Sequence, residues 1–315
     1  MKGTNSPEKE LDPSGSDSLS SRGALFPTSL SRYAFTRHSI AIAPIRSLRL
    51  RIRTAGCVVL IMLLSIGAIT ASAQKEQRSA TTKENRSEII ISAAASLADS
   101  MHVLRSNFIA LHPGIQVTYN FGSSGALQQQ IEHGAPVDVF FPAGIKQMAA
   151  LQDKSLMDDA TVRHIVKNNV VILVSKGVPH IGSFEELAGK SIASIGVGDP
   201  GSVPAGQYAV QVFRNLGIYD ELESKLILAK DVREVLTWVK TGNVHVGIVY
   251  ATDAQGIKNG ELSVDAPEGS HDPIIYPIGV VKDSEHPEEA RLFVEYLLSP
   301  QAAAVFRTFG FFPLN

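Results

Sequence analysis

The amino-acid sequence predicts an α/β fold in which mostly parallel sheets are covered by helices. Two observations lead to this prediction. Short apolar runs rich in Ile and Val recur along the chain, and stretches with the apolar spacing of helices lie between them. Such alternation is typical of parallel strands buried beneath helices. About 240 residues follow residue 73, enough for one large domain or for two of ordinary size.

The runs that we expect to form strands are short and rich in β-branched residues. They cover residues 88–92, 115–119, 137–141, 170–174, 192–195, 225–229 and 245–250. Between and after them, three sets of apolar residues share the three- and four-residue steps that place a set on one helix face. The sets are Leu97, Met101, Leu104, Phe108 and Leu111; Val232, Val235, Leu236 and Val239; and Leu292, Phe293, Tyr296 and Leu297. Gly310 follows the last predicted helix and favours its termination there.

Four predicted strands end in small or hydroxyl residues that open a helix. The segments are 89–96, 119–125, 197–206 and 227–233. The first turn of a helix has unpaired N–H groups at the positive end of the helix dipole, and both features favour an anion. In open α/β sheets ligands bind outside the carboxyl ends of the strands, where these helices begin. No obvious base, nucleophile or metal cluster accompanies the segments, so they predict binding of a small oxyanion rather than chemistry on it.

The first part of the chain has the features of a secretory signal. Four arginines within residues 46–53 precede an apolar run from about 55 to 69, and the Ala-Ser-Ala sequence at 71–73 resembles a cleavage site. We expect residues 46–73 to be a cleavable signal peptide that exports the protein, with Gln74 as the first mature residue. An uncleaved N-terminal anchor is the alternative.

Composition separates the N-terminal segment from the rest. Residues 1–45 are rich in Ser, Pro, Gly and charges, so we expect them to be disordered or to precede the true translation start. The chain has 29 Lys and Arg residues and 31 Asp and Glu residues. The first 73 residues contain 9 of the basic residues and 4 of the acidic ones. The mature part therefore has a formal charge of about −7, which argues against nucleic acid or an anionic membrane as a partner. It contains no cysteine, so we expect no disulfide.

Two other classes of function find little support in the sequence. A secreted hydrolase of oxyanion esters would need a nucleophile or a metal, but there is no Gly-x-Ser-x-Gly motif and no histidine pair at metal-binding spacing. A metal-binding protein would need several Tyr, His or carboxylate ligands near the strand ends. We therefore predict a binding protein with no catalytic residue and no cofactor.

Several motifs after residue 87 add a resemblance to a known family. They lie at 93–97 (Ala-Ala-Ala-Ser-Leu), 121–127 (Phe-Gly-Ser-Ser-Gly-Ala-Leu), 130–140, 197–200, 203–206, 231–233, 247–250 and 300–303. In order and spacing they resemble the periplasmic molybdate-binding proteins. The resemblance implies a two-lobed class II periplasmic-binding-protein fold, with mixed, mostly parallel sheets and flanking helices, that closes on its ligand about a hinge. It also implies a monomer that takes molybdate or tungstate to the membrane permease of an ABC importer; sulfate or thiosulfate is the alternative ligand.

We place one lobe at residues 86–168 plus 279–315 and the other at 169–278, with crossovers near Val170 and Ile278. By matched position, the resemblance implies five residues that contact the oxyanion oxygens without ligating the metal directly. These residues are Ser96, Ser124, Ala205, Val232 and Tyr250. The two serines would come from the first lobe and the other three from the second, so the ligand would bridge the lobes and favour the closed form.

The serines and the tyrosine also have purely structural interpretations. Ser96 could be only the N-cap of a helix that begins at Leu97, and Ser123 and Ser124 could simply start a helix. The resemblance favours Ser124 as the direct ligand and Ser123 as its neighbour. Tyr250 could be a buried aromatic residue at a strand end, or its hydroxyl could donate to the ligand.

The second-lobe candidates depend on the backbone. Ala205 and Val232 have no polar side chain, so they could act only through their N–H groups. Pro204 fits the first turn of a helix and leaves the amides after it free. We expect Asp231 to cap its own helix and thereby to place the N–H of Val232 at the exposed end. Arg233 is interpreted as a solvated helix-face residue rather than as an electrostatic support.

Overall fold

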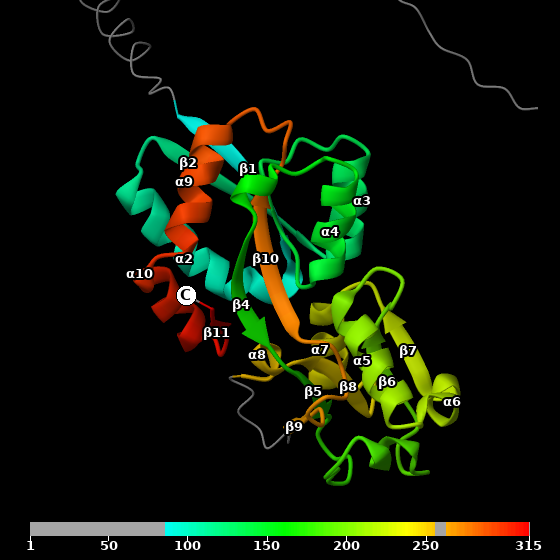
Figure 1. Ribbon diagram of the computed structural model, residues 1–315. Coiled ribbons are helices and arrows are strands. Elements are labelled where there is room, and N and C mark those ends of the chain that lie inside the picture. Colours follow the sequence, from blue (N-terminus) through cyan, green and yellow to red (C-terminus); the bar gives the residue numbers. More distant parts are fainter. Residues whose placement is uncertain (1–85, 256–262, 315) are drawn as a thin grey trace, which may run out of the picture. The chain divides into compact units, whose positions relative to one another are not determined.

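The computed structural model describes residues 86–255 and 263–314, which form two lobes, each built on its own mixed sheet with flanking helices (Figure 1). The predicted α/β fold with two lobes is confirmed. The expected signal peptide at 46–73 and the segment at 1–45 lie outside the described residues. Within the two described ranges, no helix is both long enough and apolar enough to cross a membrane.

The first lobe is built on a six-stranded sheet with the order β11-β4-β10-β3-β1-β2. Its strands are β1 (Ser87–Ala94), β2 (Ile115–Gly122), β3 (Val139–Phe141), β4 (Arg163–Asn168), β10 (Ile274–Val280) and β11 (Phe312–Pro313). The strands β2 and β3 run parallel to β1, whereas β10 runs antiparallel to β3 and β4.

Helices cover both faces of this sheet (Figure 1). One group lies on one side: α2 (Ala98–Leu111), α9 (Pro287–Leu297) and α10 (Pro300–Thr308). The pair α3 (Ser124–Glu132) and α4 (Ile145–Asp153) lies on the other. The apolar face predicted for α2 is confirmed at Met101, Leu104 and Phe108, which are buried. Leu111 was expected on the same face but is 66% exposed, because it is the last residue of the helix and extends beyond the sheet-facing turns.

The second lobe is built on a five-stranded sheet with the order β7-β6-β8-β5-β9. Its strands are β5 (Val170–Val174), β6 (Ile195–Gly198), β7 (Leu226–Ala229), β8 (Val246–Tyr250) and β9 (Ser263–Asp265). The strands β6, β7 and β8 run parallel to one another, and β5 runs antiparallel to β8. Its helices are α5 (Pro204–Asn215), α6 (Tyr219–Leu222), α7 (Val232–Thr241) and α8 (Ala251–Ala254).

The start of α7 and the end of α10 lie where the sequence predicts them. Asp231 accepts a hydrogen bond from the N–H of Glu234, so it caps α7 as expected. The apolar set of this helix is buried against β6 and β8. Gly310 has a φ of 78° just after α10, a left-handed conformation that favours glycine. In α9, Leu292 is the one member of its predicted set that is exposed, at 40%.

The chain leaves the first lobe after β4 and re-enters it at β10, and neither of these strands is among the predicted ones. The first crossover follows β4 and leads through Asn169 directly into β5. The chain returns between β9 and β10, and β10 pairs with β4 from Ile274 onward. The return therefore precedes Ile278, which we expected near the crossover. The predicted limits of the lobes otherwise stay a prediction.

The missed strands share physical features that hide them. In β4 only three of six residues are buried, so the strand has no continuous apolar run. In β10 the interior residue Pro277 argues against a strand, since proline cannot donate to the hydrogen-bond ladder. The structure tolerates it because the pairing of β10 with β4 shifts register between Tyr276 and Pro277. Local pattern alone could not reveal this irregular pairing.

The packing of α5 on β6 generates a prediction about stability. A Cβ atom on Gly206 would overlap the backbone carbonyl of Gly198, and backbone on both sides leaves little room to adjust. We expect Gly206→Ala to cost about 1–3 kcal/mol of unfolding free energy, as overpacking typically does. Gly114→Ala is the matched control, because a Cβ there meets nothing within 4 Å. Thermal melts of both variants check this; a Gly206→Ala protein as stable as the control would contradict it.

Candidate functional site

A small cavity lies between the lobes, where strands of both sheets end and helices begin. The volume of the cavity is about 10 Å³, so the cavity suits a small ion and not an extended organic solute. Its lining residues are Ala94, Ala95, Ser96, Gly122, Ser123, Ser124, Ala143, Val203, Pro204, Ala205, Asp231, Val232 and Tyr250. All five predicted site residues are among them. The structure therefore brings together in one place residues that are up to 154 positions apart (96 to 250) in the sequence.

Ser96 lies in the single turn of 3-10 helix η1 (Ala95–Leu97) that joins β1 to α2. Its side chain is buried, and its Oγ lies 3.1 Å from the hydroxyl of Tyr276. The alternative interpretation of Ser96 as an N-cap is wrong. Leu97 is the N-cap of α2, Ala94 is that of η1, and no side chain caps either helix. The hydroxyl of Ser96 is thus available to the cavity.

The two serines of the next segment have different roles. Ser123 is the N-cap of α3, and its Oγ accepts a hydrogen bond from the N–H of Ala126 at 3.4 Å. Ser124 is the first residue of the helix and is 1% exposed. Its Oγ accepts a hydrogen bond from the N–H of Ala143 at 2.9 Å. A hydroxyl that accepts a bond from the protein still has its own hydrogen to donate. Ser124 therefore presents a donor to the cavity.

Ala205 and Val232 occupy the first turns of α5 and α7. Their N–H groups have no partner within these helices, because the first four N–H groups of an α-helix are left unpaired. Pro204 takes the first position of α5, as expected. The cap at Asp231 accepts from Glu234 and leaves the N–H of Val232 at the helix end. Both residues are buried, and neither side chain has a polar atom. Only their backbone groups can therefore contribute polar contacts.

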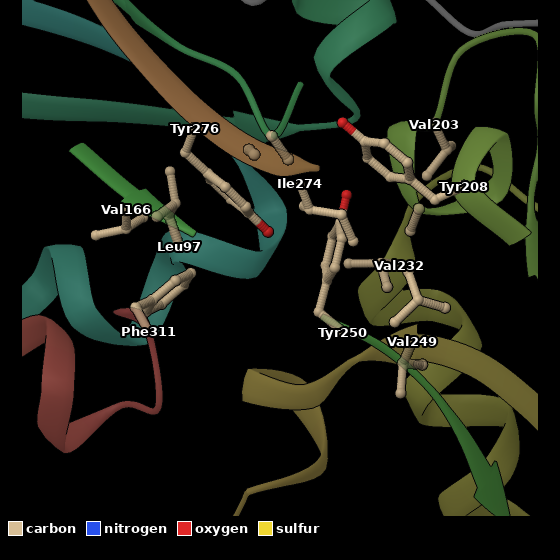
Figure 2. Packing of buried hydrophobic residues seen from close by; sticks show 14 of the residues in the cluster. Leu97, Val166, Val203, Tyr208, Val232, Val249, Tyr250, Ile274, Tyr276 and Phe311 are labelled. Atoms are coloured by element: carbon tan, nitrogen blue, oxygen red, sulfur yellow. The ribbon is translucent and has the colours of Figure 1, made fainter. Parts of the chain in front are cut away.

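Tyr250 ends β8 and is 1% exposed. Its ring lies at a centroid distance of 5.8 Å from that of Tyr276, and Figure 2 shows Tyr250 beside Val232. The hydroxyl oxygen of Tyr250 is buried and makes no hydrogen bond to any of the residues that the structure describes. Burial is the main cause that raises the pKa of Tyr250 well above its usual value, and the neighbouring Tyr276 adds to it. The hydroxyl of Tyr250 therefore stays protonated. An unpartnered buried hydroxyl is costly, and a ligand in the cavity would give it an acceptor.

The cavity offers hydrogen-bond donors without a cationic side chain. None of the described residues that line it is Lys or Arg. Its donors are hydroxyl groups and the N–H groups of helix starts, which together favour an anion. No group of three His, Cys, Asp or Glu within the described part of the chain could hold a metal ion.

Arg233 lies beside the cavity and does not have the solvated role that we expected. Its Nη2 donates to Asp99 Oδ2 at 2.7 Å, and its Nε donates to the carbonyl oxygen of Ala95 at 3.3 Å. Both partners belong to the first lobe, whereas Arg233 belongs to the second. No local pattern indicates this contact, because both partners are more than 130 positions away along the chain.

A buried carboxylate supports this arginine from its own lobe. Oδ1 of Asp253, in α8, lies 3.3 Å from Nε of Arg233, and the side chain of Asp253 is 1% exposed. Burial raises the pKa of Asp253 to about 7, and the guanidinium of Arg233 opposes this rise. Asp253 therefore restrains Arg233 in the position from which it reaches the first lobe.

Two further contacts hold the lobes together around the cavity. The N–H of Gly125 donates to the carbonyl oxygen of Ser202 at 2.8 Å, and Nε2 of Gln147 donates to Oε1 of Gln207 at 3.2 Å. Any side chain on Gly125 would collide with the backbone of Ser202, since a Cβ atom there would lie 2.6 Å from that carbonyl oxygen. The two lobes thus contact each other directly through backbone and side-chain groups beside the cavity.

Comparison with known proteins agrees with this architecture. A family model described as bacterial extracellular solute-binding protein matches residues 89–312. A putative ABC transporter substrate-binding lipoprotein of Bacillus subtilis is 39% identical over 251 residues, covering 78% of this chain and 96% of that protein. A molybdate-binding protein of Escherichia coli is 35% identical over 231 residues, covering 71% of this chain and 88% of that protein.

A solved structure is similar as well. The substrate-binding domain of a putative molybdenum ABC transporter from Clostridium difficile has a TM-score of 0.57 and 40% sequence identity, and the match covers 72% of this chain and 99% of that domain. The family match extends over both sheets and every residue of the predicted site. The chain therefore belongs to the family of bacterial extracellular solute-binding proteins and is a binding protein rather than an enzyme.

Proposed function

We propose that this protein captures molybdate, and also tungstate, between its lobes outside the cytoplasm and delivers it to the membrane permease of an ABC importer. The observation that carries the proposal is the donor set of the cavity. Two hydroxyls of the first lobe (Ser96 and Ser124) face two helix-start N–H groups (Ala205 and Val232) and one unpartnered hydroxyl (Tyr250) of the second. These five residues are the proposed contacts to the oxyanion oxygens.

Neutral donors suit a tetrahedral dianion. Removing such an ion from water requires several donors at once, and hydrogen bonds to a charged acceptor are about twice as strong as those between neutral groups. The helix dipoles of α5 and α7 add favourable potential without a counter-ion. At neutral pH phosphate often carries a proton that needs an acceptor, so a site built from donors disfavours it. Molybdate and tungstate do not have this requirement.

The choice among dianions rests on the relatives and on cavity size. Relatives at 33–35% identity are molybdate-binding proteins, which favours molybdate over the sulfate or thiosulfate alternative. Sulfate has the same charge and shape, so the donor pattern alone does not separate the two. The small cavity supports a compact inorganic ion of either kind.

The cellular setting follows from the same family. Relatives described as substrate-binding proteins of ABC transporters support an ABC permease as the partner. The signal features at 46–73 support a periplasmic location after cleavage. A monomer suffices, because one chain supplies both walls of the cavity.

The ligand can be tested with a thermal-shift series on the chain from Gln74. Molybdate, tungstate, sulfate and phosphate are compared at equal concentration. A ligand at a hundred times its Kd should add about 2.7 kcal/mol of stability. We expect a large shift with molybdate and tungstate only. A shift with sulfate instead would keep the binding site but change its ligand, and no shift with any of the four ions would refute the proposal.

The role of Ser124 can be tested by removing its hydroxyl. We expect Ser124→Ala to weaken molybdate binding about 10- to 100-fold, because a hydrogen bond to a charged group contributes about 1.5–3 kcal/mol. Ser100→Ala is the matched control, since Ser100 is equally buried but bonds only to the carbonyl of Leu97 and does not line the cavity. Calorimetric titration of both variants measures this. Equal affinity in both would remove Ser124 from the site.

Tyr250→Phe should have opposite effects on stability and on binding. Without ligand, the variant loses a buried hydroxyl that has no partner, so its melting temperature should stay equal or rise. With molybdate it lacks one donor, and we expect affinity to fall about tenfold. Melts without ligand and titrations with molybdate give the two readings. A variant that is less stable without ligand but binds normally would mean that the hydroxyl has a structural role only.

A further inference from the structure

We infer that Asn168 and Tyr276 are positioning residues that form a hydrogen-bond relay from the crossover strands to the site and orient the hydroxyl of Ser96 toward the ligand. The relay consists of three side chains in contact: the Asn168 amide, the Tyr276 hydroxyl and the Ser96 hydroxyl. None of these contacts could be expected from sequence spacing, since Ser96 and Tyr276 are 180 positions apart. The inference rests on the proposed function, because it assigns a direction to a donor of the same site.

The direction of the relay is set at Asn168, the last residue of β4. The N–H of Asn169 donates to Oδ1 of Asn168 at 2.9 Å, and a backbone N–H can only donate. This bond fixes which end of the amide is the oxygen. Nδ2 then lies 3.2 Å from the hydroxyl of Tyr276 and 3.0 Å from Oγ1 of Thr252. Because the NH₂ group has no acceptor capacity, it donates to both.

Tyr276 passes this direction on. It lies in β10 and is fully buried, and burial raises the pKa of its hydroxyl above the usual value, so the hydroxyl keeps its hydrogen. The oxygen accepts from Nδ2 of Asn168. Its single hydrogen can therefore be donated to Oγ of Ser96, 3.1 Å away. The hydroxyl cannot instead donate to Asn168, whose facing group is itself a donor.

Ser96 is left with its own hydrogen free. Its Oγ accepts from Tyr276, so the remaining hydrogen points away from that bond, and the residue lines the cavity. Ser124 has the same arrangement, because its Oγ accepts from the N–H of Ala143. In both serines a protein donor occupies the oxygen and leaves the hydrogen for an anion. Without the relay, Ser96 could turn a lone pair toward the ligand instead.

The relay also joins the site to the segments that connect the lobes. Asn168 is followed after one residue by β5 of the second lobe, and Thr252, its other partner, belongs to α8 of that lobe. Tyr276 lies on the returning strand β10. The orientation of a first-lobe ligand group thus depends on side chains at both crossovers.

The experiment uses two substitutions that change the relay with little change of shape. Tyr276→Phe removes the donor to Ser96 and keeps the ring, which packs edge-on against Tyr250 and Phe311. Asn168→Asp replaces the amide by a carboxylate of equal size, which accepts the Tyr276 hydrogen. The Tyr276 oxygen then accepts from Ser96 and withdraws the hydrogen from the cavity. Tyr296→Phe is the matched control, since Tyr296 is buried against Phe108 and does not line the cavity.

We expect molybdate affinity to fall about tenfold in Tyr276→Phe and about a hundredfold in Asn168→Asp, with Tyr296→Phe close to the wild type. The double variant separates the relay from the added charge. In the Tyr276→Phe background, Asn168→Asp should cost no more than about threefold, because no hydroxyl remains to transmit the change. Titrations are made at pH 8.5, so that the introduced carboxylate is ionised, and melts without ligand establish that each variant is folded.

The inference is overturned if folded Tyr276→Phe binds like the wild type, or if Asn168→Asp costs the same factor in both backgrounds, since its charge would then act directly through space. If Asn168→Asp does not fold, the comparison of Tyr276→Phe with Tyr296→Phe decides. A wild-type protein that binds molybdate while the variants show no difference refutes the relay alone. A wild type that binds neither molybdate, tungstate nor sulfate refutes the proposed function and the relay with it.

Discussion

The cavity depends on one constraint: an anion held without a counter-ion needs several oriented dipoles that point to one spot. A single helix start supplies few free N–H groups, so several must converge. The two parallel strand sets meet this need, because the helices that follow β1, β2, β6, β7 and β8 all begin at the edges where the sheets face each other. Each wall is thus a strand end followed by a helix start. Small residues in the first turns of these helices let backbone segments approach each other closely, since Gly125 lies against the backbone of Ser202 and Gly206 against that of Gly198.

Closure of the lobes is held by contacts that differ in character from those of the cavity. The cavity is uncharged apart from Asp231, which is engaged as a helix cap, whereas its rim carries the ion pair of Arg233 with Asp99. Asp253 lies behind the arginine and opposes its withdrawal. The charged groups therefore act on the geometry of the lobes, and the neutral groups act on the ligand. In the proposed site, this separation keeps the positive charge of Arg233 away from the ligand.

Local sequence signals predicted the fold class and the strand–helix junctions, whereas the five candidate residues at those junctions were implied by the resemblance to the molybdate-binding family. The cap at Asp231, the proline at the start of α5 and the motif around Ser124 are all short-range patterns. Three functional neighbours were missed for the opposite reason. Tyr276 lies next to a proline in a strand with a register shift, Asn168 ends a half-exposed strand, and Arg233 finds its partners in the other lobe. Their roles depend on contacts across more than 100 positions, which a single sequence does not reveal.

The nature of the donors also determines how the ligand can be released. Backbone N–H groups do not titrate, and the hydroxyl of Tyr250 keeps its hydrogen at physiological pH because it is buried. These donor groups therefore keep their hydrogens when the pH of the surroundings changes near neutrality. In the proposed site, release then requires the walls to be drawn apart so that Ser96 and Ser124 no longer face Ala205, Val232 and Tyr250. The free energy for this step would have to come from a partner that contacts both lobes at the same time, such as the proposed membrane permease.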